Sequence, residues 1–198
     1  MTLVLASTSA SRQAMLHAAQ VPFVAVAPNV DESEIKASMV AAGAGAREVA
    51  DALAELKACK VSRGIPGALV LGSDQILECD DGTLLDKPER RAGAEAHLRR
   101  LMGRVHRLVC GAVIALDGQP VWRVVDTARL TMRPLSDAFI AAYLDLEGEA
   151  VLGSVGAYRI EGPGAQLFTR IDGDHFTVMG LPLLPVLDYL RVRGVIAS

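Results

Sequence analysis

Hydrophobic and polar residues follow two patterns along this chain, which together predict a protein that combines strands with helices. Short apolar or alternating runs predict strands at 2–6, 23–27, 68–71, 107–116, 121–132, 166–171 and 175–179. Apolar residues at helical spacing predict helices at 10–19, 47–62, 89–102, 136–144 and 182–193. The sequence has no internal repeat. It therefore predicts one α/β domain over residues 1–198, with a mixed, twisted sheet flanked by helices.

The segments between these elements have weaker patterns. Residues 31–34 are acidic and predict a solvated loop, whereas residues 37–46 are rich in Ala and Gly and predict no firm element. An Asp-Asp-Gly sequence at 80–82 predicts a hairpin turn. Residues 148–164 are rich in glycine, and we expect a loop there that lets the backbone approach another group closely.

The composition narrows the range of functions. Of the 198 residues, 51% are hydrophobic and 22% charged, and the formal net charge is −3 without a long basic run. A protein bound to a nucleic acid polymer normally carries a basic face, so this partner is not expected. The apolar runs are shorter than the ~20 residues that span a bilayer, and the first residues lack the charged start of a signal peptide. We therefore expect a cytoplasmic protein without a membrane span.

Cysteine and histidine chemistry is not expected. The three cysteines, Cys59, Cys79 and Cys110, are widely separated and contain no C-x-x-C pair, which favours small buried residues over a disulfide or a zinc site. The histidines also lack the spacing of metal ligands.

An anion site is one candidate for chemistry. Ser7, Ser9 and Arg12 stand where a buried strand leads directly into a helix. Free backbone N–H groups, the helix dipole and a guanidinium together favour a bound anion. Taken alone, however, these residues fit a plain serine-capped helix with a solvated arginine equally well or better.

A carboxylate site is a second candidate. Asp74 follows an apolar strand and a Gly-Ser pair, and we expect it at the end of that strand, where α/β proteins build their sites. Asp31 and Glu32 could join it as oxygen ligands of Mg²⁺. The alternatives are a turn or helix cap for Asp74 and a solvated loop for the other two acids.

Two lysines complete a set of groups suited to phosphoryl chemistry. Lys57 lies beside the apolar face of its predicted helix, and Lys87 lies in an Asp-Lys-Pro turn. Each could be an ordinary surface charge. An anion site, two cations and a carboxylate within ninety residues nevertheless favour an enzyme that positions and neutralises phosphate groups. The sequence has neither a Walker A motif nor G-x-G-x-x-G, which excludes the P-loop and Rossmann interpretations.

Several motifs resemble the Maf, or septum-formation-inhibitor-like, nucleoside triphosphate pyrophosphatases. They cover nearly the whole chain: L-A-S-T-S-x-x-R at 5–12, V-D-E at 30–32, L-K-A at 56–58, G-S-D-Q at 72–75, D-K-P at 86–88 and F-T-V-M-G-L-P at 176–182. The resemblance implies an α/β fold with a deep cleft between two lobes, a divalent cation (Mg²⁺ or Mn²⁺) and often a homodimer. It also implies cleavage of a nucleoside triphosphate to a monophosphate and pyrophosphate.

The resemblance further implies roles for individual residues. Asp74 is the proton acceptor, and the triphosphate and the metal are served by Ser7, Arg12, Glu32, Lys57 and Lys87. We expect Asp74 and Glu32 to hold the metal, and Ser9, Gln75 and Glu161 to join the substrate contacts. Water then attacks the α-phosphorus in line, and the cations offset the charge of the leaving pyrophosphate.

Two departures from the family pattern affect this interpretation. Ala10 and Ser11 stand where the family usually has Pro-Arg, so one phosphate-facing cation is missing. Glu161 stands where the branch that prefers dTTP and UTP has Gln. An ionised carboxylate only accepts hydrogen bonds, so it fits a guanine edge, as in 7-methyl-GTP, better than a uracil edge. The alternative is that Glu161 serves the metal or the water.

Two other classes of function stay open at this point. One is a nucleotide-binding regulator of cell division with little or no catalysis, which the missing arginine favours. The other is a structural α/β adaptor that dimerises through the C-terminal helix.

Overall fold

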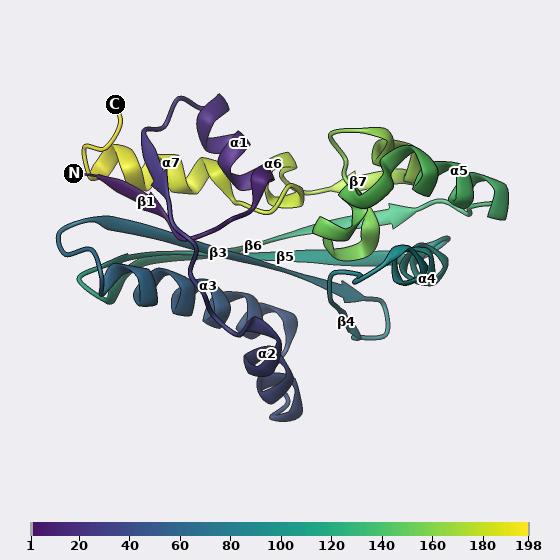
Figure 1. The fold of residues 1–198 in the computed structure, drawn as a ribbon, viewed down its shortest axis with the longest axis horizontal. Coiled ribbons are helices and arrows are strands. Elements are labelled where there is room, and N and C mark those ends of the chain that lie inside the picture. Colours follow the sequence, from purple (N-terminus) through teal and green to yellow (C-terminus); the bar gives the residue numbers. More distant parts are fainter. Residues whose placement is uncertain (1, 198) are drawn as a thin grey trace. The chain divides into compact units, whose positions relative to one another are not determined.

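The computed structural model describes residues 2–197, which form a mixed α/β fold around one seven-stranded sheet (Figure 1). The strands are β1 (Leu3–Leu5), β2 (Phe23–Ala25), β3 (Leu69–Cys79), β4 (Leu84–Leu85), β5 (Val105–Leu116), β6 (Gln119–Met132) and β7 (Phe168–Asp172). Their order is β2-β1-β3-β5-β6-β7, and β4 pairs with β3. Strand β1 runs parallel to β2 and β3, whereas the pairs β3–β4 and β6–β7 are antiparallel. The predicted mixed sheet with flanking helices is confirmed.

The α-helices lie close to the predicted ranges in most cases. They are α1 (Ala10–Ala18), α2 (Glu32–Ala41), α3 (Ala46–Ser62), α4 (Arg91–Leu101), α5 (Asp137–Glu147), α6 (His175–Val178) and α7 (Leu183–Val192). The Ser9 side chain caps α1 by accepting from the Arg12 backbone N–H, and Ser136 caps α5 in the same way through Phe139. These local signals explain why the two helix starts could be predicted.

The chain divides into two compact units. The first unit comprises residues 1–75, 109–126 and 174–198, and the second comprises 76–108 and 127–173. Strands β3, β5 and β6 contribute residues to both units.

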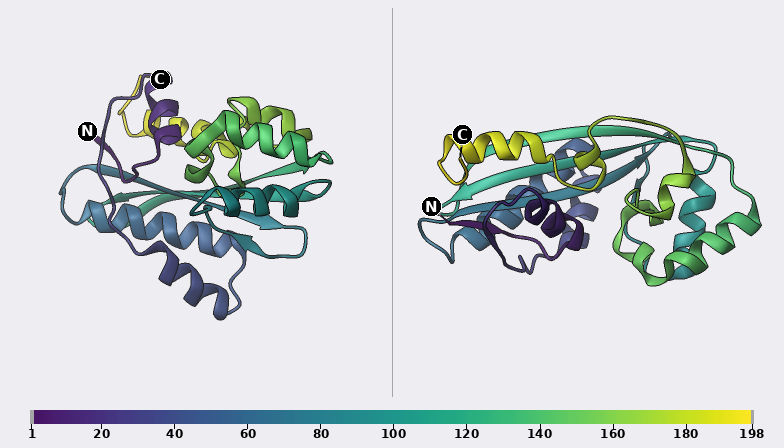
Figure 2. Two further views of the ribbon diagram at one scale, coloured as in Figure 1. Left: turned by 45° about the vertical axis from the view of Figure 1, so that its right-hand side comes forward. Right: turned by 90° about the horizontal axis from the view of Figure 1, so that it is seen from above.

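In the first unit, helices cover both faces of the sheet. Figures 1 and 2 show α3 on one face and α1 with α7 on the other. The face toward α1 and α7 buries Leu3, Leu5, Leu69 and Leu71 together with side chains of both helices. The alternate residues of the same strands, Val4 and Val70 among them, pack with Val61 of α3. This two-residue alternation fixes which side chains of β3 can reach which helix.

The second unit has its own core, built from α4, α5, parts of the long strands and three 3₁₀ helices, η1 (Gly148–Gly153), η2 (Val155–Ala157) and η3 (Pro163–Leu167). At its centre the Nε2 atom of His106 lies 2.8 Å from the Tyr158 hydroxyl oxygen, and the Tyr158 ring packs edge-on against Phe168. Burial lowers the pKa of His106 to about 4, so the imidazole is neutral at neutral pH.

Three sequence predictions were wrong in detail. The predicted strand at 175–179 is helix α6, because the Asp174 side chain accepts a hydrogen bond from the Thr177 backbone N–H and thereby caps a helical turn. The solvated loop predicted at 31–34 is the start of helix α2, which continues through the weak region as far as Ala41, since Asp31 caps this helix through the Glu34 backbone N–H. The glycine-rich loop at 148–164 is largely 3₁₀ helix.

Asp74 also lies elsewhere than predicted. It stands in the middle of β3, because the strand continues through Gly72-Ser73-Asp74-Gln75 as far as Cys79. What ends near this point is the neighbouring strand β1, whose last paired residue, Leu5, lies opposite Leu71.

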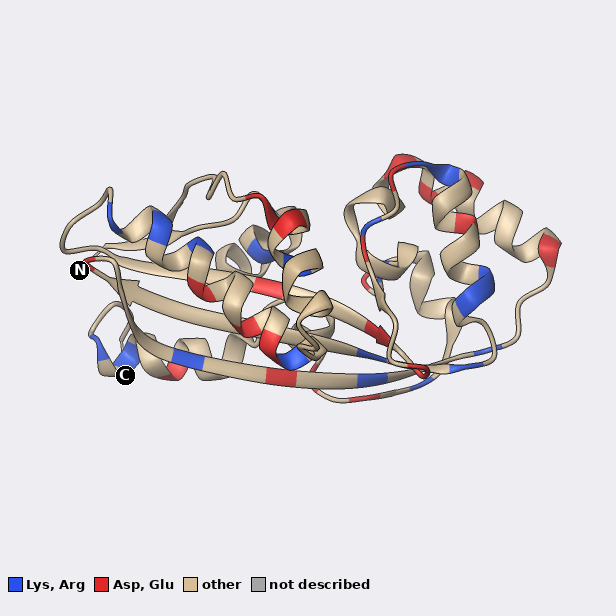
Figure 3. Cartoon of the chain, turned by 90° about the horizontal axis from the view of Figure 1, so that it is seen from below, with Lys and Arg blue, Asp and Glu red and all other residues tan. Residues whose placement is uncertain are grey.

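Charges of both signs are interspersed on the helices and long strands, as Figure 3 shows. Among residues 2–197, no helix is long and apolar enough to cross a membrane.

Candidate active site

The loop between β1 and α1 folds around the hydroxyl group of Ser7. The Oγ atom of this buried serine accepts hydrogen bonds from the Ser9 backbone N–H at 3.2 Å and from Nη1 of Arg12 at 3.3 Å. Since Ser9 also caps α1, the loop and the first helical turn are tied to one another. The predicted Ser7, Ser9 and Arg12 group therefore forms one cluster, at the N-terminus of a nine-residue helix.

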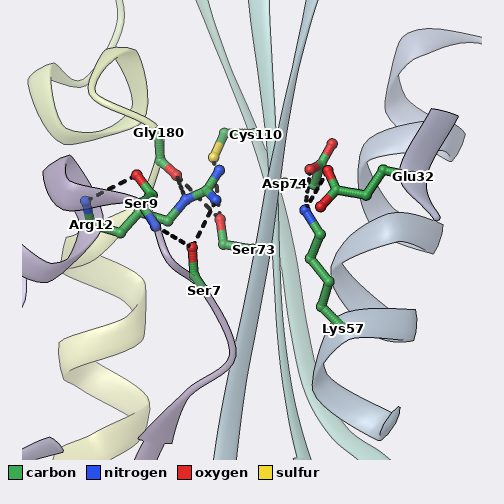
Figure 4. Close-up of polar contacts among 9 residues, drawn as sticks. All are labelled: Ser7, Ser9, Arg12, Glu32, Lys57, Ser73, Asp74, Cys110 and Gly180. Atoms are coloured by element: carbon green, nitrogen blue, oxygen red, sulfur yellow. Dashed lines mark hydrogen bonds and ion pairs between the residues drawn. The ribbon is translucent and has the colours of Figure 1, made fainter. Parts of the chain in front are cut away.

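The Arg12 guanidinium is held from a second direction by a distant part of the chain. Its Nε donates to the Gly180 carbonyl oxygen at 2.7 Å, and the buried Ser73 hydroxyl donates to the same oxygen at 3.2 Å (Figure 4). Beside Ser73 lies Cys110, 3.7 Å from Oγ to Sγ, whose pKa burial raises to about 11. This thiol is therefore protonated at neutral pH and suits a packing role.

On the other face of β3, Lys57 joins two carboxylates. Its Nζ lies 2.6 Å from Oδ1 of Asp74 and 2.9 Å from Oε2 of Glu32 (Figure 4). The side chains of Lys57 and Asp74 are only 5% and 9% exposed, whereas that of Glu32 is 48% exposed. A buried ion pair is thus open to solvent at one end, through Glu32.

Two glycines allow α3 to bring Lys57 this close to the sheet. A Cβ atom on Gly72 of β3 would lie 2.3 Å from the Ala54 carbonyl oxygen and 2.6 Å from the Ala58 nitrogen, both in the α3 backbone. A Cβ on Gly111 of β5 would lie 2.6 Å from the Ala50 carbonyl oxygen. The helix backbone therefore lies directly on two strands where neither has a side chain.

Burial raises the pKa of the Asp74 carboxyl above its ordinary value. The positive charges of Lys57 and Arg12 oppose this shift, and the negative charge of Glu32 adds to it. A carboxylate with a raised pKa is a stronger base than an exposed aspartate, which suits a proton acceptor.

The two clusters meet at consecutive residues of β3. Ser73 points toward Arg12 and Ser7, and Asp74 points the other way, toward Lys57 and Glu32, as the strand pleat requires (Figure 4). They lie just beyond the point where β1 stops pairing with β3. The site thus has a fixed guanidinium on one side of the strand, and a buried carboxylate paired with an ammonium on the other.

Thr177 and Asp126 of this region were not singled out as site residues from the sequence, whereas Gln75, predicted as a substrate contact, lies beside them. The Thr177 hydroxyl donates to Oδ2 of Asp126 at 2.6 Å. Nε2 of Gln75 donates to the carbonyl oxygens of Thr177 at 2.8 Å and Val178 at 3.1 Å. The sequence signal for Thr177 was the F-T-V-M-G-L-P stretch at 176–182, which had no chemical interpretation of its own. The contact of Gln75 with a substrate stays a prediction.

The carboxylates of Glu32 and Asp74 fit a divalent cation. Both already converge on one positive charge, the Lys57 ammonium, and Mg²⁺ commonly takes one or two protein carboxylates with water and substrate phosphate. Within residues 2–197, no group of three or more His, Cys, Asp or Glu side chains is arranged to hold a metal ion.

Two predicted site residues, Lys87 and Glu161, belong to the second unit. Lys87 is exposed in the segment that follows β4. Glu161 is 34% exposed, and its Oε1 lies 3.8 Å from Nε of Arg159. The same Nε lies 3.5 Å from Oε2 of Glu147, which is 4% exposed. The roles of Lys87 and Glu161 toward a nucleotide stay predictions.

Comparison with known proteins gives consistent matches over the length of the chain. The family model described as Maf-like protein matches residues 2–193. A nucleoside triphosphate pyrophosphatase of Hyphomonas neptunium is 52% identical over 198 residues, covering 100% of this chain and 99% of that one. Another of Sphingopyxis alaskensis is 50% identical over 194 residues, covering 98% of each. Among solved structures, a nucleoside-triphosphatase, or dITP/XTP pyrophosphatase, of Mycobacterium abscessus matches with a TM-score of 0.42 and 14% identity, covering 98% of this chain and 96% of that one.

Proposed function

Because the chain belongs to the Maf-like protein family, we propose that it is a nucleoside triphosphate pyrophosphatase, which hydrolyses its substrate to a nucleoside monophosphate and pyrophosphate. The observation that carries this proposal is the buried Lys57–Asp74 ion pair, one strand position from the Ser73–Gly180–Arg12 contacts. The names of the relatives from Hyphomonas neptunium and Sphingopyxis alaskensis support the same reaction.

In the proposed mechanism, Asp74 accepts a proton from a water molecule. The water oxygen forms a bond to the α-phosphorus as the bond from this phosphorus to the α,β-bridging oxygen breaks, and pyrophosphate leaves. Lys57 keeps Asp74 ionised and oriented until the proton arrives. Arg12, held by Ser7 and Gly180, offsets charge on the phosphates.

Glu32 and Asp74 hold the divalent cation in this proposal. When bound with the nucleotide, Mg²⁺ or Mn²⁺ supplies positive charge to the phosphate oxygens. Of the two carboxylates that would hold the cation, Glu32 is the half-exposed one. Lys87 is proposed as a further cation for the leaving pyrophosphate, and Ser9 as a further phosphate contact.

A guanine-type base, such as that of 7-methyl-GTP, is proposed over thymine and uracil. The proposal depends on Glu161, whose carboxylate only accepts hydrogen bonds and therefore pairs with the adjacent donors of a guanine edge. The competing role for Glu161 is a contact with metal or water, which has no consequence for the base.

A homodimer in the cytoplasm also belongs to the proposal. Light scattering after size-exclusion chromatography tests the dimer.

A nucleotide panel with product identification tests the reaction. The purified protein is incubated with Mg²⁺ or Mn²⁺ and dTTP, UTP, GTP or 7-methyl-GTP, and monophosphate and pyrophosphate are measured. We expect these two products in equal amounts, and a fall in kcat of about 10²–10⁴-fold in Asp74→Asn, which keeps the size of the side chain. Orthophosphate as the released product, or undiminished activity of Asp74→Asn, contradicts the mechanism. A clear preference for dTTP over all purines contradicts the guanine proposal alone.

A further inference from the structure

The segment from Asp174 to Gly180, here called the 174–180 segment, is tied to β3 through backbone carbonyl groups. Nε2 of Gln75 donates to the carbonyls of Thr177 and Val178, and the Ser73 hydroxyl donates to the carbonyl of Gly180. Thr177 is fully buried, and its hydroxyl is held by Asp126. Five hydrogen bonds, including the Asp174 cap, thus fix this short segment from several directions.

The same segment presents one acceptor to the arginine of the phosphate cluster. The Gly180 carbonyl oxygen accepts from Nε of Arg12 at 2.7 Å, across 168 positions of sequence. Gly180 has a φ of 102°, a conformation that favours glycine, and a Cβ there would lie 3.7 Å from both Nη2 of Arg12 and Oε1 of Gln75. The left-handed backbone therefore turns this carbonyl toward the guanidinium.

Arg12 is consequently fixed through two of its nitrogens. Nε is bound to Gly180 and Nη1 to Ser7, which sets the plane of the guanidinium. A planar guanidinium binds phosphate best when its orientation is set in advance.

We propose that the 174–180 segment is the positioning element of Arg12, and that Gln75 and Ser73 are positioning residues that act through it. This inference deepens the proposed function. It rests on that function only in taking Arg12 to bind the phosphates of the substrate. Both amide hydrogens of Gln75 are already bound to carbonyls, so its amide nitrogen has no donor left for a nucleotide. Gln75 influences the substrate through the geometry of Arg12.

The direct test measures the Arg12 guanidinium without any nucleotide. In a ¹H–¹⁵N correlation spectrum, the Arg12 Nε–H signal is assigned by its disappearance in Arg12→Lys. We expect slow solvent exchange in the wild type, and exchange at least tenfold faster in Gln75→Met, which keeps the side-chain length but removes both donors. Ser73→Ala, which removes one donor, is expected to give a smaller acceleration. Gln119→Met, at the exposed first residue of β6, is the matched control and is expected to leave the signal unchanged.

A second test uses inorganic tripolyphosphate as a competitive inhibitor that has no base or sugar. We expect its inhibition constant to rise about tenfold in Gln75→Met, because the arginine loses part of its fixed orientation. In an Arg12→Ala background the same substitution is expected to add nothing, since both residues act through one guanidinium. The ranking of kcat/KM among nucleotides is expected to stay as in the wild type.

Three outcomes overturn the proposal. One is unchanged Nε–H exchange in both Gln75→Met and Ser73→Ala, when their melting curves show folded protein. Another is that Gln75→Met raises the inhibition constant of tripolyphosphate as much in the Arg12→Ala background as in the wild type. The third is a changed order of nucleotides in Gln75→Met, which assigns Gln75 to the base. If the protein hydrolyses no nucleotide at all, the proposed function fails, and the exchange measurement still decides whether Gln75 and Ser73 position Arg12.

Discussion

Gly72 determines how closely helix α3 can approach strand β3, and thus whether Lys57 reaches Asp74. In Gly72→Ala, the new Cβ lies 2.3 Å from the Ala54 carbonyl oxygen and 2.6 Å from the Ala58 nitrogen. Both atoms belong to the helix backbone and cannot rotate away. Ordinary van der Waals contact begins near 3.4 Å, so the helix has to move away from the strand by about 1 Å.

This displacement acts on the ion pair at the site. Lys57 lies one position before Ala58 on α3, and its Nζ is 2.6 Å from Oδ1 of Asp74. A movement of about 1 Å exceeds the tolerance of such a charged hydrogen bond, and misplacement of this size can reduce an enzymatic rate about 10²-fold. Overpacking of a core typically costs about 1–3 kcal/mol of stability as well.

The assay measures both quantities on the same protein. We expect kcat/KM for pyrophosphate release to fall by about 10²-fold in Gly72→Ala, and the free energy of unfolding in urea to fall by about 1–3 kcal/mol. Activity is compared at a urea-free condition where the unfolding curve shows the variant to be folded. The matched control is Gly64→Ala, just after α3, where the nearest atom to a Cβ is the Val61 carbonyl oxygen at 3.5 Å. This variant is expected to resemble the wild type.

Wild-type kcat/KM in Gly72→Ala would refute this reasoning. It would mean either that α3 does not move or that the Lys57–Asp74 contact is not needed for the reaction. A loss of stability with full activity would separate the two, because it would show that the helix has moved without consequence for the rate.

Two other substitutions are expected to change pH profiles. Lys57→Met removes a cation that opposes the raised pKa of Asp74, so this pKa rises further and the acid limb of kcat/KM moves to higher pH, with a lower maximum. The control is Lys60→Met on the same helix, whose exposed ammonium binds the Asn29 carbonyl. His106→Gln is expected to flatten the pH dependence of stability. The folded-state pKa of about 4 lies below the ordinary 6.5, so His106 stabilises the fold above pH 6.5, and this contribution is lost as the pH falls. Between pH 7 and 5 the wild type is expected to lose roughly 2 kcal/mol through this group, measured by urea unfolding at each pH.

Each of these predictions can be contradicted by a specific result. An acid limb that stays in place or moves to lower pH in Lys57→Met shows that Lys57 does not act on the proton acceptor. An equal slope of unfolding free energy against pH in His106→Gln and wild type shows that His106 does not become protonated as the protein unfolds.

Local patterns in the sequence determined much of this protein. The serine caps of α1 and α5, the apolar stripe of α3 and the short strands were all predictable, because they depend on residues only a few positions apart. The sequence also singled out Arg12, Lys57 and Asp74 as candidate site residues, through the combination of an anion site with cations and a carboxylate and through a family resemblance. Membership of that family is confirmed by the matching model.

Tertiary structure decided how these groups are arranged. Helix α6 stands where alternation predicted a strand, because its cap and its carbonyl partners, among them Gln75 about a hundred positions away, outweigh the local pattern. Asp74 lies within a strand because β3 has neighbours to pair with beyond its Gly-Ser pair. The Lys57–Asp74 contact needs a helix lying on a glycine, and Arg12 needs a carbonyl 168 positions away. Such contacts depend on the packing of distant segments, which no local periodicity contains.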